Sequence, residues 1–175
     1  MITNCYSGRV VGGTDARIEE FPFYVNFKRN FRPFCGGTIL DETHILTAAH
    51  CKIRAGDTVT YGTDVRSTRE NVITVSSAVA HPDVSEIGVW WMDYQIATLS
   101  SPIPFSNKAK VVEFGSESEF DNMVKKGQAQ CVVTGMGRAG KGGSKVYKEK
   151  LQKGEQTYVP SGCAMYYRSL RIFNK

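Results

Sequence analysis

The segment Cys35-Gly-Gly-Thr-Ile-Leu-Asp-Glu-Thr-His-Ile-Leu-Thr-Ala-Ala-His-Cys51 is the most informative stretch of this sequence. It places His50 directly beside Cys51, with a second cysteine sixteen positions earlier. A disulfide between these two cysteines would close a loop, pin His50 and constrain the unfolded chain by ~3 kcal/mol in the chain-entropy model. The alternative is that His50 is a structural histidine with no role beyond filling its place beside a disulfide.

The sequence around this segment is typical of an all-β protein. Short runs rich in Val, Ile, Thr, Tyr and Phe recur between Gly, Pro, Asn and Asp residues. Strands are expected at Phe23–Phe27, Thr58–Tyr61, Asn71–Val75, Ile96–Leu99 and Cys131–Thr134. No stretch keeps apolar residues at helical spacing for three turns, so the expected helix is the short Thr47–Cys51. The pattern alone does not distinguish a barrel from a sandwich. A possible joint lies at Pro102–Gly115, which separates two strand-rich halves.

Composition and charge exclude several classes of protein. The chain has 175 residues, 41% of them hydrophobic, which is enough for one ordinary globular domain. No segment approaches the ~20 apolar residues of a membrane span, so no membrane partner is expected. The formal charge is +5, and five lysines gather in Lys141–Lys153. That run contains no arginine and a single aromatic residue, Tyr147, so we interpret it as a solvated loop rather than a nucleic-acid site.

The five cysteines are widely spaced: Cys5, Cys35, Cys51, Cys131 and Cys163. No Cys-x-x-Cys pair suggests zinc or redox chemistry, and the acidic residues around Glu70 are too sparse to predict calcium. We therefore expect no metal and no cofactor. Wide spacing favours disulfides and an oxidising compartment, although the odd count leaves at least one thiol without a partner in the chain. The first five residues contain no apolar run of the kind that a signal peptide needs.

Four motifs, in order, resemble the trypsin/chymotrypsin-like serine protease family. The catalytic histidine of that family lies in a Thr-Ala-Ala-His-Cys motif after a Cys-Gly-Gly strand, which corresponds to His50 here. Arg9-Val-Val-Gly-Gly13 resembles its activation site, and Asp93 begins an Asp-Tyr-Gln-Ile-Ala-Thr-Leu-Ser-Ser-Pro-Ile segment similar to that of the triad aspartate. Cys131-Val-Val-Thr-Gly-Met-Gly137 resembles its Cys-Val-Val-Ser-Gly-Trp-Gly, with Met136 in place of the tryptophan.

The resemblance implies a two-barrel chymotrypsin-like fold. Residues 1–9 are then a short propeptide-like segment, and residues 10–175 are a partial protease domain. Within it we expect a complete first barrel over residues 10–105. Residues 116–175 are expected to form part of a second barrel that is incomplete at its C-terminal end.

The same resemblance assigns the chemistry. His50 is the expected general base and Asp93 the carboxylate that orients it, as in the family's Ser-His-Asp triad. The nucleophile belongs in a Gly-Asp-Ser-Gly-Gly motif, which these 175 residues do not contain. Ser144 lies in the nearest string, Gly-Gly-Ser-Lys, but that string lacks the aspartate and the following glycines. The expectation is therefore a chain truncated before its nucleophile and inactive by itself, without the oxyanion hole and specificity pocket.

Further expectations follow from the family. Cleavage after Arg9 would free a new amino terminus at Val10, as in a zymogen. Cys35 pairs with Cys51, the protein is extracellular, and it meets protein or peptide substrates or another protein partner. Cys131 resembles a cysteine whose family partner is not in this sequence.

Several residues depart from the family pattern. Gln95 stands where a small apolar residue is preferred beside the aspartate, which puts the geometry of Asp93 in question. Gly154 and Gln156 stand at two expected inward apolar places of a later strand, and burial of two valines there would contribute ~1.5–3 kcal/mol each. Three hypotheses stay open: a complete serine endopeptidase of which this sequence is a part, a catalytically silent secreted paralogue that acts as a binding or decoy module, and a non-functional fragment.

Overall fold

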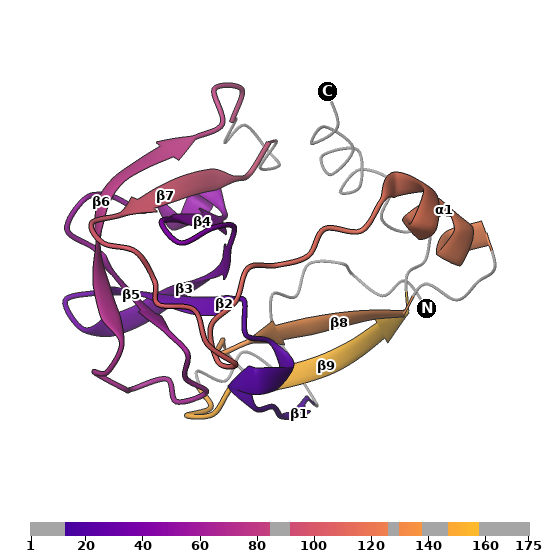
Figure 1. The fold of residues 1–175 in the computed structure, drawn as a ribbon, viewed down its shortest axis with the longest axis horizontal. Helices are drawn as coiled ribbons and strands as arrows, with labels where there is room; N and C mark the ends of the chain where they lie inside the picture. Colours follow the sequence, from indigo (N-terminus) through magenta and orange to yellow (C-terminus); the bar gives the residue numbers. More distant parts are fainter. Residues whose placement is uncertain (1–12, 85–91, 126–129, 138–146, 158–175) are drawn as a thin grey trace.

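The computed structural model describes residues 13–84, 92–125, 130–137 and 147–157. In these ranges the chain forms a closed six-stranded barrel, a smaller three-stranded sheet and one α-helix (Figure 1). None of the described helices is long and apolar enough to cross a membrane. The predicted all-β class is confirmed.

The barrel is built from six antiparallel strands. They are β2 (Tyr24–Arg29), β3 (Arg32–Ile39), β4 (His44–Thr47), β5 (Thr58–Tyr61), β6 (Val72–Ala80) and β7 (Gln95–Leu99). Their order is β2-β3-β4-β7-β6-β5, and β5 pairs with β2 to close the ring. Closure removes the exposed edges that an open sheet would present.

Apolar side chains fill the barrel because inward and outward positions alternate along each strand. Phe27, Ile39 and Ile45 are completely buried in this core. Gly37 lies on β3 where a Cβ atom would come within 2.7 Å of Ile45 Cγ2 and 2.8 Å of Phe27 Cε2. The second glycine of the Cys-Gly-Gly motif is therefore required by close packing inside the barrel.

The smaller sheet contains β1 (Thr14–Asp15), β9 (Gln152–Thr157) and β8 (Gln130–Gly135), in the order β1-β9-β8. In the view of Figure 1 its strands β8 and β9 extend from the barrel towards the side where the helix α1 (Glu117–Lys125) is drawn. Gly154 pairs with Val133 in the β8–β9 ladder and is only half-buried. Its backbone therefore takes part in strand pairing, although it has no side chain to contribute to a core. The predicted incomplete second barrel extends into residues outside the described ranges, and that part stays a prediction.

Strand β2 is buried on both faces. Val25 and Phe27 point into the barrel, whereas Tyr24 and Asn26 face the smaller sheet. There the Tyr24 hydroxyl accepts a hydrogen bond from the Met136 N–H at 3.3 Å, and Asn26 Nδ2 donates to Met136 Sδ at 3.6 Å. Burial raises the pKa of Tyr24 to about 12. A second small core thus joins the two sheets, and its buried members are Ala16, Ile18, Tyr24, Met136 and Leu151.

The expected strands are present, with shifted ends. Thr58–Tyr61 matches β5 fully, and β6 continues five residues past the expected end at Val75 because β7 pairs with that extension. The short helix is a 3-10 turn over Ala49–Cys51.

The structure also contains the nine-residue helix α1, which was not among the elements expected from the sequence. Its apolar residues Phe120, Met123 and Val124 recur at helical spacing, but over fewer than the three turns that the sequence criterion required. A capping box starts it: the Ser116 Oγ accepts from the Glu119 N–H at 3.2 Å, and Glu119 Oε2 accepts from the Ser116 N–H at 2.8 Å.

Candidate active site

The 3-10 turn after β4 holds His50 in place. Cys51 on this turn is bonded to Cys35 on β3, with the two Cα atoms 6.1 Å apart, so the predicted disulfide is confirmed. The Thr47 hydroxyl donates to the Gly36 carbonyl at 2.8 Å and ties the end of β4 to β3. Lys52 then ends the turn in the left-handed conformation, with φ 51°. The Thr-Ala-Ala-His-Cys motif is therefore anchored at both of its ends.

Asp93 lies just before β7 and binds His50 through both carboxylate oxygens. Its Oδ1 accepts from the His50 backbone N–H at 2.8 Å, and its Oδ2 lies 2.6 Å from His50 Nδ1. The two residues are 43 positions apart in the sequence, and the β4–β7 pairing brings them together. One carboxylate thus fixes both the backbone and the ring of the histidine.

This contact determines the form of the imidazole. An ionised carboxylate can only accept hydrogen bonds, so Nδ1 carries the proton that is shared with Asp93. In a neutral ring the other nitrogen, Nε2, is then the basic one. The His50 side chain is 51% exposed and that of Asp93 is 25% exposed. The arrangement can therefore accept a proton at Nε2 from a group that approaches from solvent.

Gln95, at the start of β7, supports this pair instead of disturbing it. The Gln95 side chain is buried, and its Oε1 accepts from the Ile53 N–H at 3.0 Å while its Nε2 donates to the Ile53 carbonyl at 2.9 Å. Ile53 follows His50 by three residues and Gln95 follows Asp93 by two. The amide side chain therefore joins the two segments that carry the pair. From the sequence, Gln95 had been interpreted as a departure from the family pattern.

An ion pair organises the turn that follows His50. The Arg29 guanidinium donates to both oxygens of Asp57 at 2.7 Å, and its Nη2 also donates to the Lys52 carbonyl at 2.8 Å. Asp57 Oδ2 accepts from the Arg54 N–H at 3.0 Å as well. The hydrogen bonds from Arg29 hold the pKa of Asp57 below its ordinary value.

Sequence reasoning missed one aromatic contact beside Asp93. Tyr94 packs edge-on against His81 with ring centroids 4.8 Å apart, and the Tyr94 carbonyl accepts from the His81 N–H at 3.0 Å. The Tyr94 hydroxyl donates to Met92 Sδ at 3.1 Å. The rings come together because β6 pairs with β7, with Val79 opposite Ile96 and Ala80 opposite Gln95. This pairing is not a local sequence signal.

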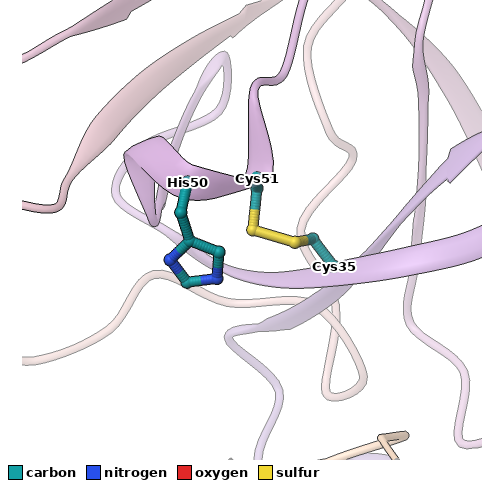
Figure 2. Close-up of side chains that lie close together, drawn as sticks. All are labelled: Cys35, His50 and Cys51. Carbon is teal, nitrogen blue, oxygen red and sulfur yellow. A yellow bond between two sulfur atoms is a disulfide. The ribbon is translucent and has the colours of Figure 1, made fainter. Parts of the chain in front are cut away.

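Cys35, His50 and Cys51 form a compact group whose potential ligand atoms lie within 4.8 Å of one another. Figure 2 shows the imidazole beside the two joined sulfur atoms. Because the sulfurs are bonded to each other, neither is a thiolate, and metal binding by cysteine needs the thiolate. In this oxidised form the group is a disulfide next to a histidine and does not supply a set of metal ligands.

Several expected residues cannot be placed. Arg9 and Val10, which resemble an activation site, lie outside the described residues. So do Cys5, Ser144 and Cys163.

Comparisons with known proteins identify a matching family model, related sequences and a similar fold. The Trypsin family model matches residues 10–170. Hypodermin-B of Hypoderma lineatum is 35% identical over 133 residues, which are 74% of this chain and 49% of the relative. A trypsin of Phaedon cochleariae is 30% identical over 149 residues, which are 79% of this chain and 54% of the relative. The chain spans about half the length of the curated relatives it matches.

A solved structure has the same fold. It is neuropsin, a serine protease expressed in the limbic system of mouse brain, with a TM-score of 0.73 and 19% identity. The match covers 90% of this chain and 69% of that one. At this identity the likeness concerns the fold alone.

Proposed function

The chain belongs to the trypsin family, whose family model matches residues 10–170, and on this premise we propose that it carries the proton-transfer pair of a serine endopeptidase. His50 is the general base, and Asp93 is the carboxylate that orients it. The substrates are the peptide bonds of proteins or peptides.

The chemistry needs three groups. A hydroxyl attacks the carbonyl carbon of the peptide bond, and the imidazole takes the hydroxyl proton at Nε2 and later donates it to the leaving amine. The carboxylate holds the tautomer with the proton on Nδ1 and stabilises the imidazolium that forms. The Ser-His-Asp triad of this family is the established example of this division of roles.

One observation carries the proposal: both oxygens of Asp93 bind His50, one at the ring and one at the backbone N–H. A carboxylate that only balanced charge would need neither the ring geometry nor the second bond. The exposure of half the imidazole leaves it accessible to a substrate and a nucleophile.

The pair is not sufficient for cleavage. Residues 1–175 contain no Gly-Asp-Ser-Gly-Gly segment, and base catalysis without a nucleophile has no proton to remove. An oxyanion hole is needed too, since removal of one donor from such a hole costs about 10²–10³-fold in rate. We therefore propose that the polypeptide of these 175 residues is inactive by itself.

Activation and location follow the family pattern in this proposal. Cleavage after Arg9 frees the amino group of Val10, and the protein acts outside the cell, where the Cys35–Cys51 disulfide is stable. Digestion of the purified chain with a Lys/Arg-specific protease, followed by amino-terminal sequencing, tests the first of these points. A stable product that begins at Val10 supports it, and cleavage only at other sites contradicts it.

A silent binding module is the weaker alternative, because two departures that favoured it have structural uses. Gln95 makes two hydrogen bonds to Ile53, and Met136 fills the small core beside Tyr24. Neither substitution disturbs the contact of Asp93 with His50.

The decisive experiment restores the missing groups. Residues 10–170 are joined to the C-terminal part of the Phaedon cochleariae trypsin, and hydrolysis of a peptide amide is measured. We expect activity that His50→Ala or Asp93→Asn lowers by about 10⁴-fold in kcat, the loss that is characteristic of the family's triad. A chimera that is folded and active with the same rate in both variants would contradict the proposal.

A second measurement does not depend on the chimera. In the 175-residue chain, the Nδ1 proton of His50 gives a hydrogen-bonded downfield NMR signal that Asp93→Asn removes. Asp41→Asn is the matched control, because Asp41 Oδ2 lies 2.9 Å from Nδ1 of His44 in a second histidine–aspartate pair. This control changes the His44 signal and leaves that of His50 in place. A His50 spectrum that is the same with and without the Asp93 carboxylate would contradict the assignment.

A further inference from the structure

The backbone that carries Asp93 determines where its carboxylate points. Among the residues that the structure describes, both hydrogen bonds of this carboxylate go to His50, one to the ring and one to the backbone N–H. In those ranges no third group donates to it. The carboxylate therefore reaches the histidine only if its own backbone is held in the right direction.

That backbone is a tight turn. Asp93 is the central residue of a three-residue turn in which the Tyr94 N–H donates to the Met92 carbonyl at 2.8 Å. Met92 has φ 49°, in the left-handed region that residues other than glycine seldom adopt. Strain of this kind persists only where the surrounding structure imposes it, and it clusters at functional sites. The turn that carries Asp93 must therefore be held by its neighbours.

Tyr94 holds the turn at three points. Its hydroxyl donates to Sδ of Met92 at 3.1 Å, and the Met92 side chain is buried. Its ring packs edge-on against His81, with the centroids 4.8 Å apart and an angle of 69° between the planes, which is a favoured arrangement of two aromatic rings. Its carbonyl accepts from the His81 N–H at 3.0 Å. The ring and the backbone of the tyrosine are thus tied to the same residue.

His81 is itself fixed to the barrel. It directly follows β6, whose last residue, Ala80, lies opposite Gln95 of β7. The His81 Nδ1 accepts from the Asp83 N–H at 3.1 Å, and its carbonyl accepts from the Val84 N–H at 3.0 Å. The ring cannot rotate without loss of the first of these bonds. The imidazole is therefore a rigid support that the end of a barrel strand presents to the turn.

We propose that Tyr94 and His81 are positioning residues for the histidine–aspartate pair, an inference that rests on the proposed role of Asp93. The contact between the two rings and the hydroxyl bond to Met92 hold the turn. In that position one Asp93 oxygen meets Nδ1 of His50 while the other meets its backbone N–H. Neither positioning residue has a step of its own in proton transfer, and both act through the carboxylate.

The size of the effect follows from the geometry of catalysis. A displacement of about 1 Å in a catalytic group can lower a rate by about 10²-fold. Loss of the ring contact leaves the negative charge of Asp93 near His50 but no longer holds the two hydrogen bonds in place. The loss of rate is therefore smaller than that of Asp93→Asn, in which the charge and the acceptor for Nδ1 are both changed.

The first test measures the Nδ1 proton signal of His50 by NMR in the full 175-residue chain, where Asp93→Asn assigns the signal. Tyr94→Leu removes the ring contact and the hydroxyl bond, and we expect the signal to broaden and lose intensity through exchange with water. His81→Ala removes the other ring and gives the same change. Tyr94→Phe loses only the bond to Met92, and its signal lies between those of the wild type and Tyr94→Leu.

Phe23→Leu is the matched control. Phe23 is half-buried, as Tyr94 is, and it lies edge-on to Phe21 with the ring centroids 6.2 Å apart. Loss of this ring lowers the thermal midpoint as loss of the tyrosine ring does, but leaves the His50 signal as in the wild type. A purely structural role of Tyr94 would give the same His50 signal in the two variants.

Kinetics in the chimera with the trypsin C-terminal part supply a second readout. We expect Tyr94→Leu to lower kcat by about tenfold to a hundredfold and to leave KM unchanged. A fall in kcat without a change in KM is expected for an interaction that acts in the transition state and not in substrate binding. Tyr94→Phe recovers most of this rate, and Phe23→Leu retains all of it.

The outcomes separate this inference from the proposed function. A His50 signal that Asp93→Asn does not change would remove the role of Asp93, and the positioning role with it. If Asp93→Asn removes the signal while Tyr94→Leu and His81→Ala leave it as in the wild type, the pair stands and the positioning role is overturned. Where Tyr94→Leu does not fold, Tyr94→Phe and His81→Ala decide the point by the same comparison.

Discussion

The Gln95 side chain exchanges two hydrogen bonds with the backbone of Ile53, accepting from its N–H at 3.0 Å and donating to its carbonyl at 2.9 Å. This buried amide connects the segment after His50 with the segment after Asp93. The geometry of the histidine–aspartate pair therefore depends on a residue outside the pair.

Gln95→Leu keeps the volume and removes both hydrogen bonds. The Ile53 N–H and carbonyl then stay buried without partners, and an unsatisfied buried group costs about 1–3 kcal/mol. We expect the free energy of unfolding in urea to fall by about 2–4 kcal/mol. Broadening of the His50 Nδ1 proton signal should accompany the loss. Ser100→Ala, at an exposed position just after β7, changes neither measurement; a Gln95→Leu chain as stable as this control would contradict the role of the amide.

Asp57→Asn tests the ion pair with Arg29. The partner guanidinium loses a buried carboxylate at 2.7 Å, and we expect a loss of about 2 kcal/mol near neutral pH. The folded-state pKa of Asp57 lies below its ordinary value of 3.8, mainly through its hydrogen bond with Arg29. The contribution of this carboxylate is therefore complete above that value and is lost as the pH falls through the lowered folded pKa. Chemical denaturation at a series of pH values should show wild type and variant converging in acid, whereas a constant difference would be contrary to the linkage.

Gly37→Ala tests the close packing within the barrel. The added methyl group meets Ile45 and Phe27 at less than 3 Å, and overpacking of a core costs about 1–3 kcal/mol. Gly135→Ala is the matched control, because a Cβ at that end of β8 meets no atom within 4 Å. The thermal midpoint should fall for the first variant and stay within about 1 °C of wild type for the second. Equal midpoints would show that the barrel relaxes around the methyl group.

Replacement of both Cys35 and Cys51 by alanine removes the bridge that holds the turn of His50. The closed loop spans sixteen positions, for which the chain-entropy model predicts a loss of about 3 kcal/mol. Urea unfolding of this variant and of reduced wild type should agree within error. Cys131→Ser, which changes the free cysteine of the described residues, should leave stability almost unaltered. A similar loss in Cys131→Ser would indicate that this thiol has a structural role of its own.

Much of the barrel could be predicted because its strands carry local signals. Thr58–Tyr61 and Ile96–Leu99 are short runs of β-branched and apolar residues between turn residues, and both are strands. The Cys35–Cys51 bridge and the nearness of Asp93 to His50 came from the family resemblance, since no local pattern relates residues 43 positions apart.

What was missed has nonlocal or polar causes. The helix α1 is shorter than three turns, so its apolar spacing at Phe120, Met123 and Val124 and its capping box at Ser116 are weak signals in the sequence. Gln95 appeared unsuitable because its hydrogen-bond partner, Ile53, lies 42 residues away and is identified only in three dimensions.

Strand β2 has no face in contact with water along Tyr24–Lys28, since the barrel core covers one side and Met136, Leu151 and the loop at Thr68 cover the other. A polypeptide cut just after the barrel would expose Tyr24 and Asn26 to solvent, so the barrel shares part of its interior with the smaller sheet. Amide hydrogens of β2 should consequently exchange only when the whole molecule opens, and the small three-stranded sheet acts as the second half of a shared interior.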